Sequence, residues 1–567
     1  MEPITSSSAE ATWKKLFIAF GALTFIILPL LSHAYGQSGD EWLQIVYGQD
    51  IWNYFFHGDQ QALSYDVLLH PGRNMTQFQG QHLYGGLFDF STEALHHWFP
   101  GIPLLTLRHF CNALTSALMM VSTGLIARRL SGRWSVGFLA LLFIFFSPRI
   151  FGEGMNNPKD IPFGAGFALA VYAVLALLQD GKRRIVLHSV LLALGFGLAF
   201  GVRSAGGLLF GVYMVAMIAG YLIFDKERRT AIWTDKKVRT RLALAIVGSL
   251  VVGYVIGLLA WPWGAQSPIS HPIESLQGMT NRDVAVRTLF EGEYTVGAEL
   301  PSHYELKWIF ISNPISVIIG AVLFLLFALR IRKARGTFVM LFPVFGALFP
   351  LLYMVYKHSV VYDTWRHVFF VYPFWVVMAA IGWWMAGEFV LSKIKRTKDV
   401  LGKPLYWMAI PVALLIPAVI WTLKEHPNQA VYFNEFAGGI KGANGQYETD
   451  YYYNSSAQDV AWILKDIPRT PGKKSIILTN MGGFGPNCFL NDTAFTGSDY
   501  CRPDRLATRD WDYYIIFPRN IPDEMVLNEN WVPQDAAYVV KAGGVPLSAV
   551  IKNPHTAPPA TAAPAGK

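Results

Sequence analysis

The chain has 567 residues, of which 53% are hydrophobic and only 15% are charged. Soluble domains carry about 25% charged residues, so this composition excludes an ordinary soluble protein. Apolar runs of about 20 residues recur and are continuous rather than alternating, which indicates membrane-spanning helices and argues against a membrane barrel. The net charge of +8 is better explained by basic loops between these runs than by a nucleic acid partner.

The apolar runs, taken in chain order, predict eleven membrane spans. We expect them at 14–33, 104–127, 134–148, 161–179, 184–202, 205–224, 242–262, 312–330, 337–356, 368–389 and 405–423. The first run lacks a small-x-small cleavage site, so we interpret it as a signal anchor that stays in the protein. An odd number of spans puts the two chain ends on opposite sides of the membrane.

The connections between spans alternate in character along the chain. One set is short and basic, and it reads "ARRLSGRW", "DGKRRI", "DKERRTAIWTDKKVRTR", "RIRKARG" and "KIKRTKDVLGK". The positive-inside rule places this set and the N-terminus in the cytoplasm. The segments then expected on the outer face are 34–103, 149–160, 263–311, 357–367 and 424–567.

The chain changes character after Lys424. "SSAQDVAWILKDI" has the periodicity of an amphipathic helix, and "KSIILT", "DYYIIF" and "AYVVKAGGVPLSAVIKN" read as short strands. The final stretch, "PHTAPPATAAPAGK", is of low complexity. We therefore predict a membrane domain over 1–424 with its first outer loop at 34–103, a small α/β domain over 425–552, and a disordered tail over 553–567.

Two of the three cysteines fall in the predicted outer domain. Cys488 and Cys501 end a short loop in "GPNCFLNDTAFTGSDYC", whereas Cys111 lies in an apolar span. An oxidising compartment would allow a disulfide between Cys488 and Cys501, and two free thiols are the alternative.

Ionisable residues gather in the predicted outer loops, and at a bilayer edge such residues are candidates for function. They are Asp40 and Glu41; Glu153, Lys159 and Asp160; Arg203; His303, Tyr304 and Lys307; and Lys357, His358, Tyr362, Asp363, Arg366 and His367.

Each of these groups also has a purely structural interpretation. Asp40 and Asp160 stand where they could cap the helices that follow them, and Arg203 could reach from a span end to the interface. Arg366 could stabilise a tight turn by pairing with Asp363. Five outer loops that all carry such groups favour a shared site over five separate structural roles.

The order and sidedness of these motifs resemble the GT-C glycosyltransferases, and within them the protein O-mannosyltransferase and lipid A aminoarabinose transferase group (glycosyltransferase family 39-like). "GDEWLQIVYGQDI" resembles the Asp-Glu motif of their first outer loop. Asp160 in "NNPKDIPFG" stands at their second acidic motif, and Arg203 in "GVRSAGG" stands where they place a basic residue for the donor phosphate. The resemblance covers residues 10–425, and "HPNQAVYFNEFAGGIKGANGQYETDYY" is similar to a segment of bacterial members.

The resemblance implies a polytopic α-helical membrane protein of the GT-C fold with about eleven transmembrane helices in a bacterial inner membrane, plus a small periplasmic α/β domain. Two departures bear on the acceptor. The second acidic motif is Lys-Asp here, and a repeat-rich outer domain like that of eukaryotic mannosyltransferases is missing from the sequence. A protein acceptor is therefore less favoured than a glycan or a lipid.

The implied reaction moves a sugar from a polyprenyl-phosphate donor to an envelope acceptor on the periplasmic face, with inversion at the anomeric carbon. Asp40 would be the general base, and Glu41 and Asp160 would shape the site, orient the acceptor or hold a metal. Arg203, Arg366 and Lys307 would bind the donor phosphate. The residues expected to contact substrate are Lys159, His303, Tyr304, Tyr362 and His367.

We expect no required cofactor. Whether the protein binds a divalent metal is left open, because some GT-C members hold one. The outer loops, however, lack a close ligand spacing such as His-x-x-x-His. The main alternative function is a transporter or flippase of a lipid-linked sugar, and a membrane scaffold is a third. Charges at one membrane face rather than mid-span favour surface chemistry over alternating access.

Overall fold

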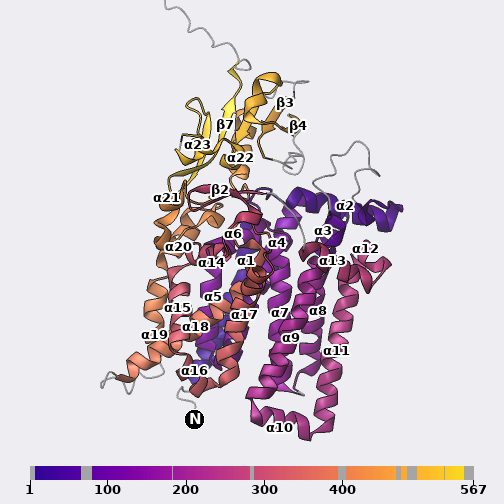
Figure 1. The fold of residues 1–567 in the computed structure, drawn as a ribbon, viewed down its shortest axis with the longest axis vertical. Helices are drawn as coiled ribbons and strands as arrows, with labels where there is room; N and C mark the ends of the chain where they lie inside the picture. The colour runs from indigo at the N-terminus through magenta and orange to yellow at the C-terminus, as the bar shows by residue number, and fades with distance from the viewer. Residues whose placement is uncertain are drawn as a thin grey trace, which may run out of the picture.

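A computed structural model of the chain describes residues 7–64, 80–181, 183–280, 286–393, 404–467, 474–481, 495–528 and 530–554. Helices form a tall bundle, and an α/β region stands on one of its ends (Figure 1). Within these residues, eight helices are long and apolar enough to cross a membrane, or up to eleven if each of three bent helix pairs is one span. The predicted class, a polytopic helical membrane protein with a small C-terminal α/β region, is confirmed.

The unbent spans agree with the predicted ranges within a few residues. The helices are α1 (Ser7–Ser32), α4 (Leu104–Ser131), α7 (Asp160–Asp180), α8 (Ile185–Val202), α9 (Ser204–Phe224), α11 (Lys236–Leu259), α17 (Thr337–Tyr356), and η5 (Arg366–Val371) with α18 (Tyr372–Lys393).

The other three predicted spans are each broken by a sharp bend. They consist of α5 (Trp134–Phe145) with α6 (Pro148–Asn156), α14 (Tyr304–Ile311) with α15 (Ile315–Leu326), and α19 (Pro404–Ala413) with α20 (Ile416–Lys424). The bends are 67°, 117° and 56° respectively. Pro148, Pro314 and Pro417 lie at the breaks, where a missing N–H and the proline ring prevent a continuous helix.

Helix α7 and the η5–α18 segment form the centre of the bundle. Their most apolar stretches are 94% buried, whereas that of α11 is 22% buried and faces outward. Helix α8 approaches α7 closely at Gly166, where an added Cβ would lie 2.6 Å from the Ala199 nitrogen. Small residues allow such close backbone contact between membrane helices.

The two ends of the bundle differ in charge. The lower end in Figure 1 holds α10 (Lys226–Thr234), α16 (Ala328–Arg335) and the start of α1, and it carries the basic connections. The upper end carries the α/β region (Figure 1). The segregation agrees with the alternation predicted from the sequence, while the assignment of each end to a compartment stays a prediction.

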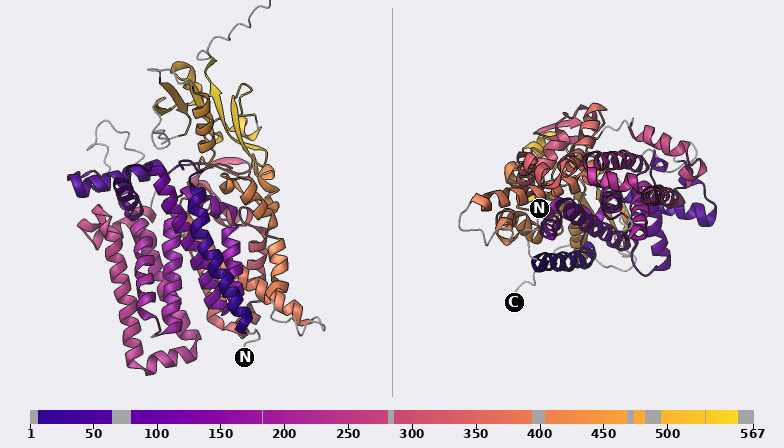
Figure 2. Two further views of the ribbon diagram at one scale, coloured as in Figure 1. Left: turned by 180° about the vertical axis from the view of Figure 1, so that it is seen from behind. Right: turned by 90° about the horizontal axis from the view of Figure 1, so that it is seen from below.

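Short elements cover the upper end of the bundle (Figure 2). They are α2 (Glu41–His57), η1 (Gln61–Leu63), η3 (Gln81–Leu83), α3 (Leu87–Trp98), α12 (Pro262–Gln266), α13 (Ser270–Thr280), β1 (Arg287–Phe290), β2 (Glu293–Val296) and η4 (Gly297–Glu299). The connection from α20 to the α/β region adds η6 (Gln429–Val431), η7 (Glu435–Ala437) and α21 (Gly439–Ala443).

The α/β region contains a five-stranded sheet of order β4-β3-β5-β7-β6. The strands are β3 (Ser475–Thr479), β4 (Phe495–Tyr500), β5 (Tyr513–Ile516), β6 (Tyr538–Ala542) and β7 (Val545–Lys552). The region's helical elements are α22 (Ser456–Asp466), η9 (Pro503–Thr508), η10 (Pro518–Asn520) and α23 (Asp523–Leu527).

Strand β3 pairs in parallel with β4 and β5, whereas β7 is antiparallel to β5 and β6. The predicted helix and strands are confirmed, and β4 is an additional strand. The proposed disulfide stays a prediction because Cys488 lies outside the described residues. The tail from residue 555 onward also lies outside them.

Candidate functional site

Asp40 precedes α2, but its side chain does not cap that helix. Its Oδ2 atom instead accepts a hydrogen bond from Nη1 of Arg366 at 2.9 Å. The two residues are 326 positions apart in the chain. The structure therefore favours a site role for Asp40 over the capping role that its position also allowed.

Asp160 is held in place by the break between α6 and α7. The Asn157 side-chain amide donates to Glu153 at 2.9 Å and to Asp160 at 3.0 Å. Asp160 also pairs with Arg203, and its Oδ2 lies 3.4 Å from Nη1 of Arg366. Arg203 is thus fixed by an ion pair and does not reach alone towards an interface.

Arg366 joins these groups to the loop before η5. Its Nη2 donates to Asp363 at 2.8 Å, in addition to the contacts with Asp40 and Asp160. We call the set formed by Asp40, Asp160, Arg203, Asp363 and Arg366 the carboxylate–arginine cluster. The turn pairing expected from the sequence is present, and the same arginine also connects two distant carboxylates.

Members of the carboxylate–arginine cluster differ in their access to solvent. The Asp40 side chain is 26% exposed and that of Arg203 is 18% exposed, whereas Asp160 is only 2% exposed. Asp40 is therefore the most accessible to a substrate of the cluster's three carboxylates. Asp160 is buried and is held by its ion pairs with Arg203 and Arg366.

A cavity of about 420 Å³ lies against this cluster. Its polar lining residues are Tyr84, Arg203, Ser204, Tyr353, Ser359, Tyr362 and His367. Most of its remaining lining is apolar and comes from α9, α13, α17 and η5, including Leu208, Leu209, Val212, Leu276, Met279, Phe349, Pro350 and Met354. The cavity thus has the character of a site for an amphiphile.

Two polar atoms in this lining lack a protein partner. Among the described residues, neither Nε of Arg203 nor Nδ1 of His367 has a hydrogen-bond partner, although both atoms are buried. An unsatisfied buried polar atom costs about 1–3 kcal/mol, so a polar ligand group at this position would stabilise the site.

Glu41 enters a different cluster from its neighbour Asp40. Its carboxylate lies 3.0 Å from Nε2 of His109 and 3.6 Å from Nε of Arg108, and it accepts a bond from the Ser38 backbone at 3.2 Å. Arg108 also pairs with Asp89 at 2.8 Å. We call Glu41, Asp89, Arg108 and His109 the support cluster, because it ties α2 and α3 to α4.

The support cluster is sealed from solvent. The side chains of Glu41 and Arg108 are each 1% exposed. Burial raises the pKa of Asp89 to about 6, although Arg108 acts in the opposite direction. Glu41 therefore lies where it can hold the start of α2 and is not brought to the carboxylate–arginine cluster.

Other predicted substrate residues are divided between the site and its surroundings. Lys159 is buried, its Nζ lies 4.0 Å from the centroid of the Tyr84 ring, and it donates to the Gln44 side-chain oxygen at 3.0 Å when that amide is oriented to satisfy its neighbours. Tyr362 and His367 line the cavity and their rings lie 4.7 Å apart.

The predicted residues of the outer segment 263–311 lie elsewhere. Lys307 and His303 pair with Glu291 at 3.3 and 3.5 Å on a partly exposed surface. Tyr304 is buried, and its hydroxyl accepts a hydrogen bond from the Thr364 backbone at 3.0 Å. Tyr304 thus supports the loop that carries Asp363, whereas Lys307 and His303 are not joined to the carboxylate–arginine cluster.

The segment that ends in Tyr451 and Tyr452 was noted in the sequence for its resemblance to bacterial members, but no role in the site was predicted for it. The Tyr451 hydroxyl bonds to Glu153, and the Arg366 guanidinium lies 5.2 Å from the centroid of the Tyr452 ring. An added Cβ on Gly39 would lie 3.3 Å from Tyr452, so this ring packs directly on the loop before α2. The tyrosine run in "QYETDYYYNSS" was the available signal, because Tyr combines a large apolar ring with a hydroxyl that usually finds a hydrogen-bond partner when it is buried.

The backbone at the site adopts conformations that are unfavourable for residues with a side chain. Asp363, Thr364 and Tyr453 have φ angles of 55°, 63° and 60°. Each such residue costs about 1–3 kcal/mol and persists only when its surroundings hold it. The loop before η5 and the tyrosine segment are therefore both held in place by their contacts.

In the part of the chain that the structure describes, no three His, Cys, Asp or Glu side chains come together in a group that could hold a metal ion. The expectation that no metal is required, with a divalent metal still possible, stays a prediction.

Residues 106–254 match the family described as dolichyl-phosphate-mannose-protein mannosyltransferase. The resemblance to GT-C glycosyltransferases is thereby confirmed over this segment. The matched segment runs from α4 to α11 and includes Asp160 and Arg203, but Asp40 and Arg366 lie outside it. A search of curated proteins found no match to the chain.

Solved structures with a similar arrangement include two membrane proteins. ArnT from Cupriavidus metallidurans bound to undecaprenyl phosphate is 14% identical, with 95% of this chain and 98% of that chain covered and a TM-score of 0.48. The oligosaccharyltransferase AglB from Archaeoglobus fulgidus, in complex with an inhibitory peptide and a dolichol-phosphate, is 11% identical, with 88% and 69% covered and a TM-score of 0.45.

Proposed function

We propose that this protein is a membrane glycosyltransferase that transfers a sugar from a polyprenyl-phosphate donor to an acceptor of the cell envelope. One observation carries the proposal. The apolar cavity is lined in part by Arg203 and His367, whose Nε and Nδ1 atoms are buried without a partner among the described residues, and Arg203 belongs to the carboxylate–arginine cluster. The family match over residues 106–254 supports the same reaction class.

The donor would lie with its lipid chain along the apolar lining of α9 and α17. Its phosphate would accept hydrogen bonds from the two unsatisfied nitrogen atoms, Nε of Arg203 and Nδ1 of His367. Charge-assisted hydrogen bonds from a guanidinium to phosphate are among the stronger ones in proteins. Arg203 would thereby stabilise the negative charge that develops on the leaving phosphate.

Asp40 would act as the general base. As the acceptor hydroxyl oxygen attacks the anomeric carbon, its proton passes to the Asp40 carboxylate, and the bond from that carbon to the phosphate oxygen breaks. The polyprenyl phosphate leaves with the bonding electrons, and a single displacement inverts the anomeric centre. Arg366 would hold Asp40 in position through the 2.9 Å contact.

The remaining predicted residues take supporting roles in this proposal. Asp160 orients Arg203, Tyr362 and His367 contact the donor head, and Glu41 and Lys159 support the walls of the site. Lys307 and His303 are left out because their ionic partner is Glu291. We place the site at the periplasmic face and the N-terminus in the cytoplasm, because the basic connections lie at the opposite end of the bundle.

The decisive experiment gives purified protein a panel of polyprenyl phosphates that carry a hexose, a pentose or an amino sugar. Envelope extract from a strain lacking the protein serves as acceptor, and release of free polyprenyl phosphate is measured. Consumption of one donor by wild type, and its loss in Asp40→Asn, is expected. Movement of the intact lipid across vesicles without donor consumption would instead establish the transporter.

A further inference from the structure

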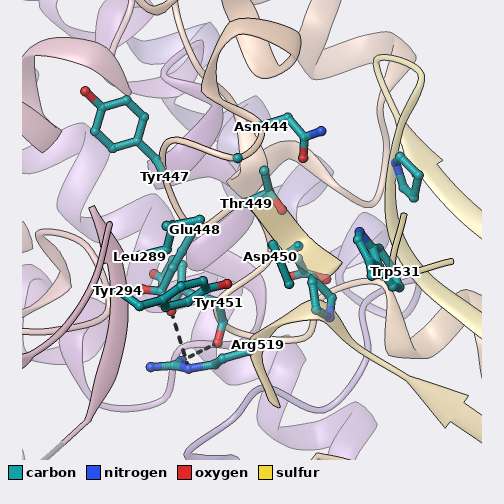
Figure 3. A pocket seen from close by; sticks show the side chains of 14 residues that line it. Leu289, Tyr294, Asn444, Tyr447, Glu448, Thr449, Asp450, Tyr451, Arg519 and Trp531 are labelled. Carbon is teal, nitrogen blue, oxygen red and sulfur yellow. Dashed lines mark hydrogen bonds and ion pairs between the residues drawn. The ribbon is translucent and has the colours of Figure 1, made fainter. Parts of the chain in front are cut away.

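The α/β region reaches the carboxylate–arginine cluster through Arg519. This residue lies in η10, directly after β5. Its Nη2 bonds to Asp363. Its Nη1 donates to the Tyr451 carbonyl at 2.8 Å, and its Nε lies 3.5 Å from Glu448 (Figure 3). The Arg519 side chain is 14% exposed, so these contacts are largely buried.

Asp363 is shared between two arginines from different parts of the fold. Its Oδ1 atom bonds to Arg519, and its Oδ2 atom accepts from Arg366 at 2.8 and 3.1 Å. Arg366 in turn holds Asp40. A continuous chain of ion pairs therefore runs from the α/β region to the proposed base.

The loop between α17 and η5 needs this support. Asp363 and Thr364 both have left-handed backbone angles, which cost free energy for residues with a Cβ. Arg366, Arg519 and the Tyr304 hydroxyl are the partners that hold this pair in the structure. Loss of one partner would let the loop relax and would turn Arg366 away from Asp40.

The docking of the α/β region on the site is close. An added Cβ on Gly36 would lie 2.7 Å from the Ser456 hydroxyl at the start of α22. The Asn156 amide, at the end of α6, donates to Asn454 at 3.2 Å. The α/β region therefore contacts both segments that carry the acidic motifs.

We propose that Arg519 is a positioning residue of the transferase site, and that the α/β region must be docked for Arg366 to hold Asp40 in its working orientation. The proposal rests on the proposed function for its kinetic consequence. Its structural consequence, a loop at 357–365 that is held by Arg519, does not depend on the substrate.

The test compares Arg519→Ala, Arg519→Lys and a matched control in the full-length protein. The control is Arg502→Ala, which removes an exposed arginine of the same region that pairs with Asp504 at 3.0 Å. We expect Arg519→Ala to lower kcat about 10- to 100-fold with little change in the donor KM, as for other residues that orient a reacting group. Arg519→Lys should recover part of the loss, and Arg502→Ala should match wild type.

A double variant and an exchange measurement separate positioning from simple stabilisation. Because Arg519 acts through Asp363, Arg519→Ala combined with Asp363→Asn should be no slower than Asp363→Asn alone. Amide hydrogen exchange of residues 357–365 should be faster in Arg519→Ala than in Arg502→Ala. A lower melting temperature with unchanged kcat, or additive losses in the double variant, would overturn the positioning role.

The two proposals can fail separately. If wild type consumes no lipid-linked sugar, the proposed function fails, and the exchange measurement still decides whether Arg519 holds the loop. If wild type is active and Arg519→Ala is equally active, only the positioning role fails.

A second feature, at the lower end of the bundle, is independent of the site. A cavity of about 280 Å³ is lined by Lys14, Leu125, Arg128, Arg129, Trp134, Tyr172, Asp180, Arg183 and Arg184. Five of these side chains are cationic and one is anionic. The positive-inside rule explains the sign of the charge, but it does not explain why cations from α1, α4 and the α7–α8 connection surround one hollow.

The single carboxylate that lines this cavity already has an ionic partner. Asp180 pairs with Arg129 at 2.9 Å. Arg128, in the last turn of α4, lies 4.9 Å from the centroid of the Trp134 ring, and its buried Nε has no hydrogen-bond partner within the described ranges. The cavity therefore has an excess of positive charge and an unsatisfied buried donor.

We infer that this cavity binds a phosphate ester, either the head group of an anionic phospholipid of the adjacent leaflet or a soluble phosphate compound. Basic pockets between membrane helices bind anionic head groups in this way. A head group would give Arg128 the acceptor that it lacks, while Leu125 and Tyr172 would contact the acyl region.

Binding can be measured by native mass spectrometry of the full-length protein titrated with phosphatidylglycerol, phosphatidylcholine or inorganic phosphate. We expect retention of phosphatidylglycerol over phosphatidylcholine. Arg128→Gln, and the exposed Arg183→Gln as a variant that should fold normally, should each weaken this binding about fivefold, as expected for one cation near a head group. Arg332→Ala, an exposed arginine of α16, is the control.

Competition identifies the source of the phosphate. Displacement of phosphatidylglycerol by millimolar inorganic phosphate would support the anion site and assign it to a soluble compound. Equal binding in Arg128→Gln, Arg183→Gln and Arg332→Ala would overturn the inference, since the lipid would then be held elsewhere.

Discussion

Asp40 and Glu41 are neighbours in the chain, yet they belong to two clusters that use the same chemistry differently. Arg366 gathers three carboxylates in the carboxylate–arginine cluster, and Arg108 gathers two in the support cluster. The side chain of Asp40 is 26% exposed, whereas that of Glu41 is 1% exposed. Paired charges at a membrane edge therefore do not identify a site by themselves.

What separates the two clusters is their relation to an apolar cavity. Arg203 lines the cavity and keeps an unsatisfied buried nitrogen there. The support cluster instead lies between α2, α3 and α4, where its charges fix the packing of these helices. Buried ion pairs of this kind are hard to break once formed, because removing one partner leaves an uncompensated charge.

The largest expected effect comes from Asp40→Asn. The variant removes the proposed base and keeps the size of the side chain, so kcat should fall about 10²- to 10⁴-fold while the melting temperature changes little. Asp59→Asn, at an exposed position after α2, is the matched control. Steady-state release of polyprenyl phosphate provides the measurement, and wild-type turnover by Asp40→Asn would remove the distinction between the two clusters.

Arg203→Ala should have the next largest effect. It deletes the proposed phosphate contact and leaves Asp160 with Arg366 alone, so kcat should fall about 10²- to 10³-fold, as for other losses of a group that stabilises developing charge. Arg203→Lys should retain part of the activity because it keeps the charge. If both variants kept full activity in the same assay, the donor phosphate would have to bind elsewhere.

Glu41→Gln tests the other side of the comparison. It weakens the contacts with Arg108 and His109, so we expect a loss of about 1–3 kcal/mol in stability, seen as a lower melting temperature. The activity per folded molecule should stay close to that of wild type. A large fall in kcat without loss of stability would make Glu41, rather than Asp40, the candidate base.

The smallest effect is a change in pH dependence at Glu448, beside the carboxylate–arginine cluster. Burial raises the pKa of Glu448 from its ordinary value of 4.5 to about 7. The folded protein therefore keeps this proton up to about pH 7, whereas the unfolded chain loses it near pH 4.5. Ionisation of Glu448 therefore lowers the free energy of unfolding progressively between about pH 4.5 and pH 7, and this loss stays constant at higher pH.

Glu448→Gln should accordingly raise the melting temperature at pH 8 and leave it nearly unchanged at pH 4.5. Thermal unfolding at both pH values, with the exposed Glu524→Gln as control, measures the difference. A variant less stable than wild type at pH 8 would mean that the contact with Arg519 outweighs the cost of burial.

Much of the fold could be predicted from the sequence because its signals are local. Continuous apolar runs and the alternation of basic connections gave the spans, since a bilayer imposes both on any chain that crosses it. Short runs rich in Ile, Val, Tyr and Leu predicted β3, β5, β6 and β7. The bends in three spans were not predicted, although Pro148, Pro314 and Pro417 lie at these bends and proline disfavours a continuous helix.

The site was predicted in part. Asp40, Asp160, Arg203 and Arg366 are brought together as expected, because each lies at a span end on the same side of the bundle. Glu41 was expected beside Asp40, but adjacent residues on a helix do not share a face, and α2 turns Glu41 towards α4. Arg519 and Tyr452 were missed because only the docking of a distant region carries them to the cluster.

The multi-span membrane class, with charged groups collected at one end, could be inferred from the amino-acid sequence, since hydrophobic length and charge segregation are properties of each segment. The tertiary structure alone decided which of those groups share a cavity and which are sealed. That outcome depends on how α2, α7, η5 and η10 pack, and contacts between residues hundreds of positions apart leave no local pattern in the chain.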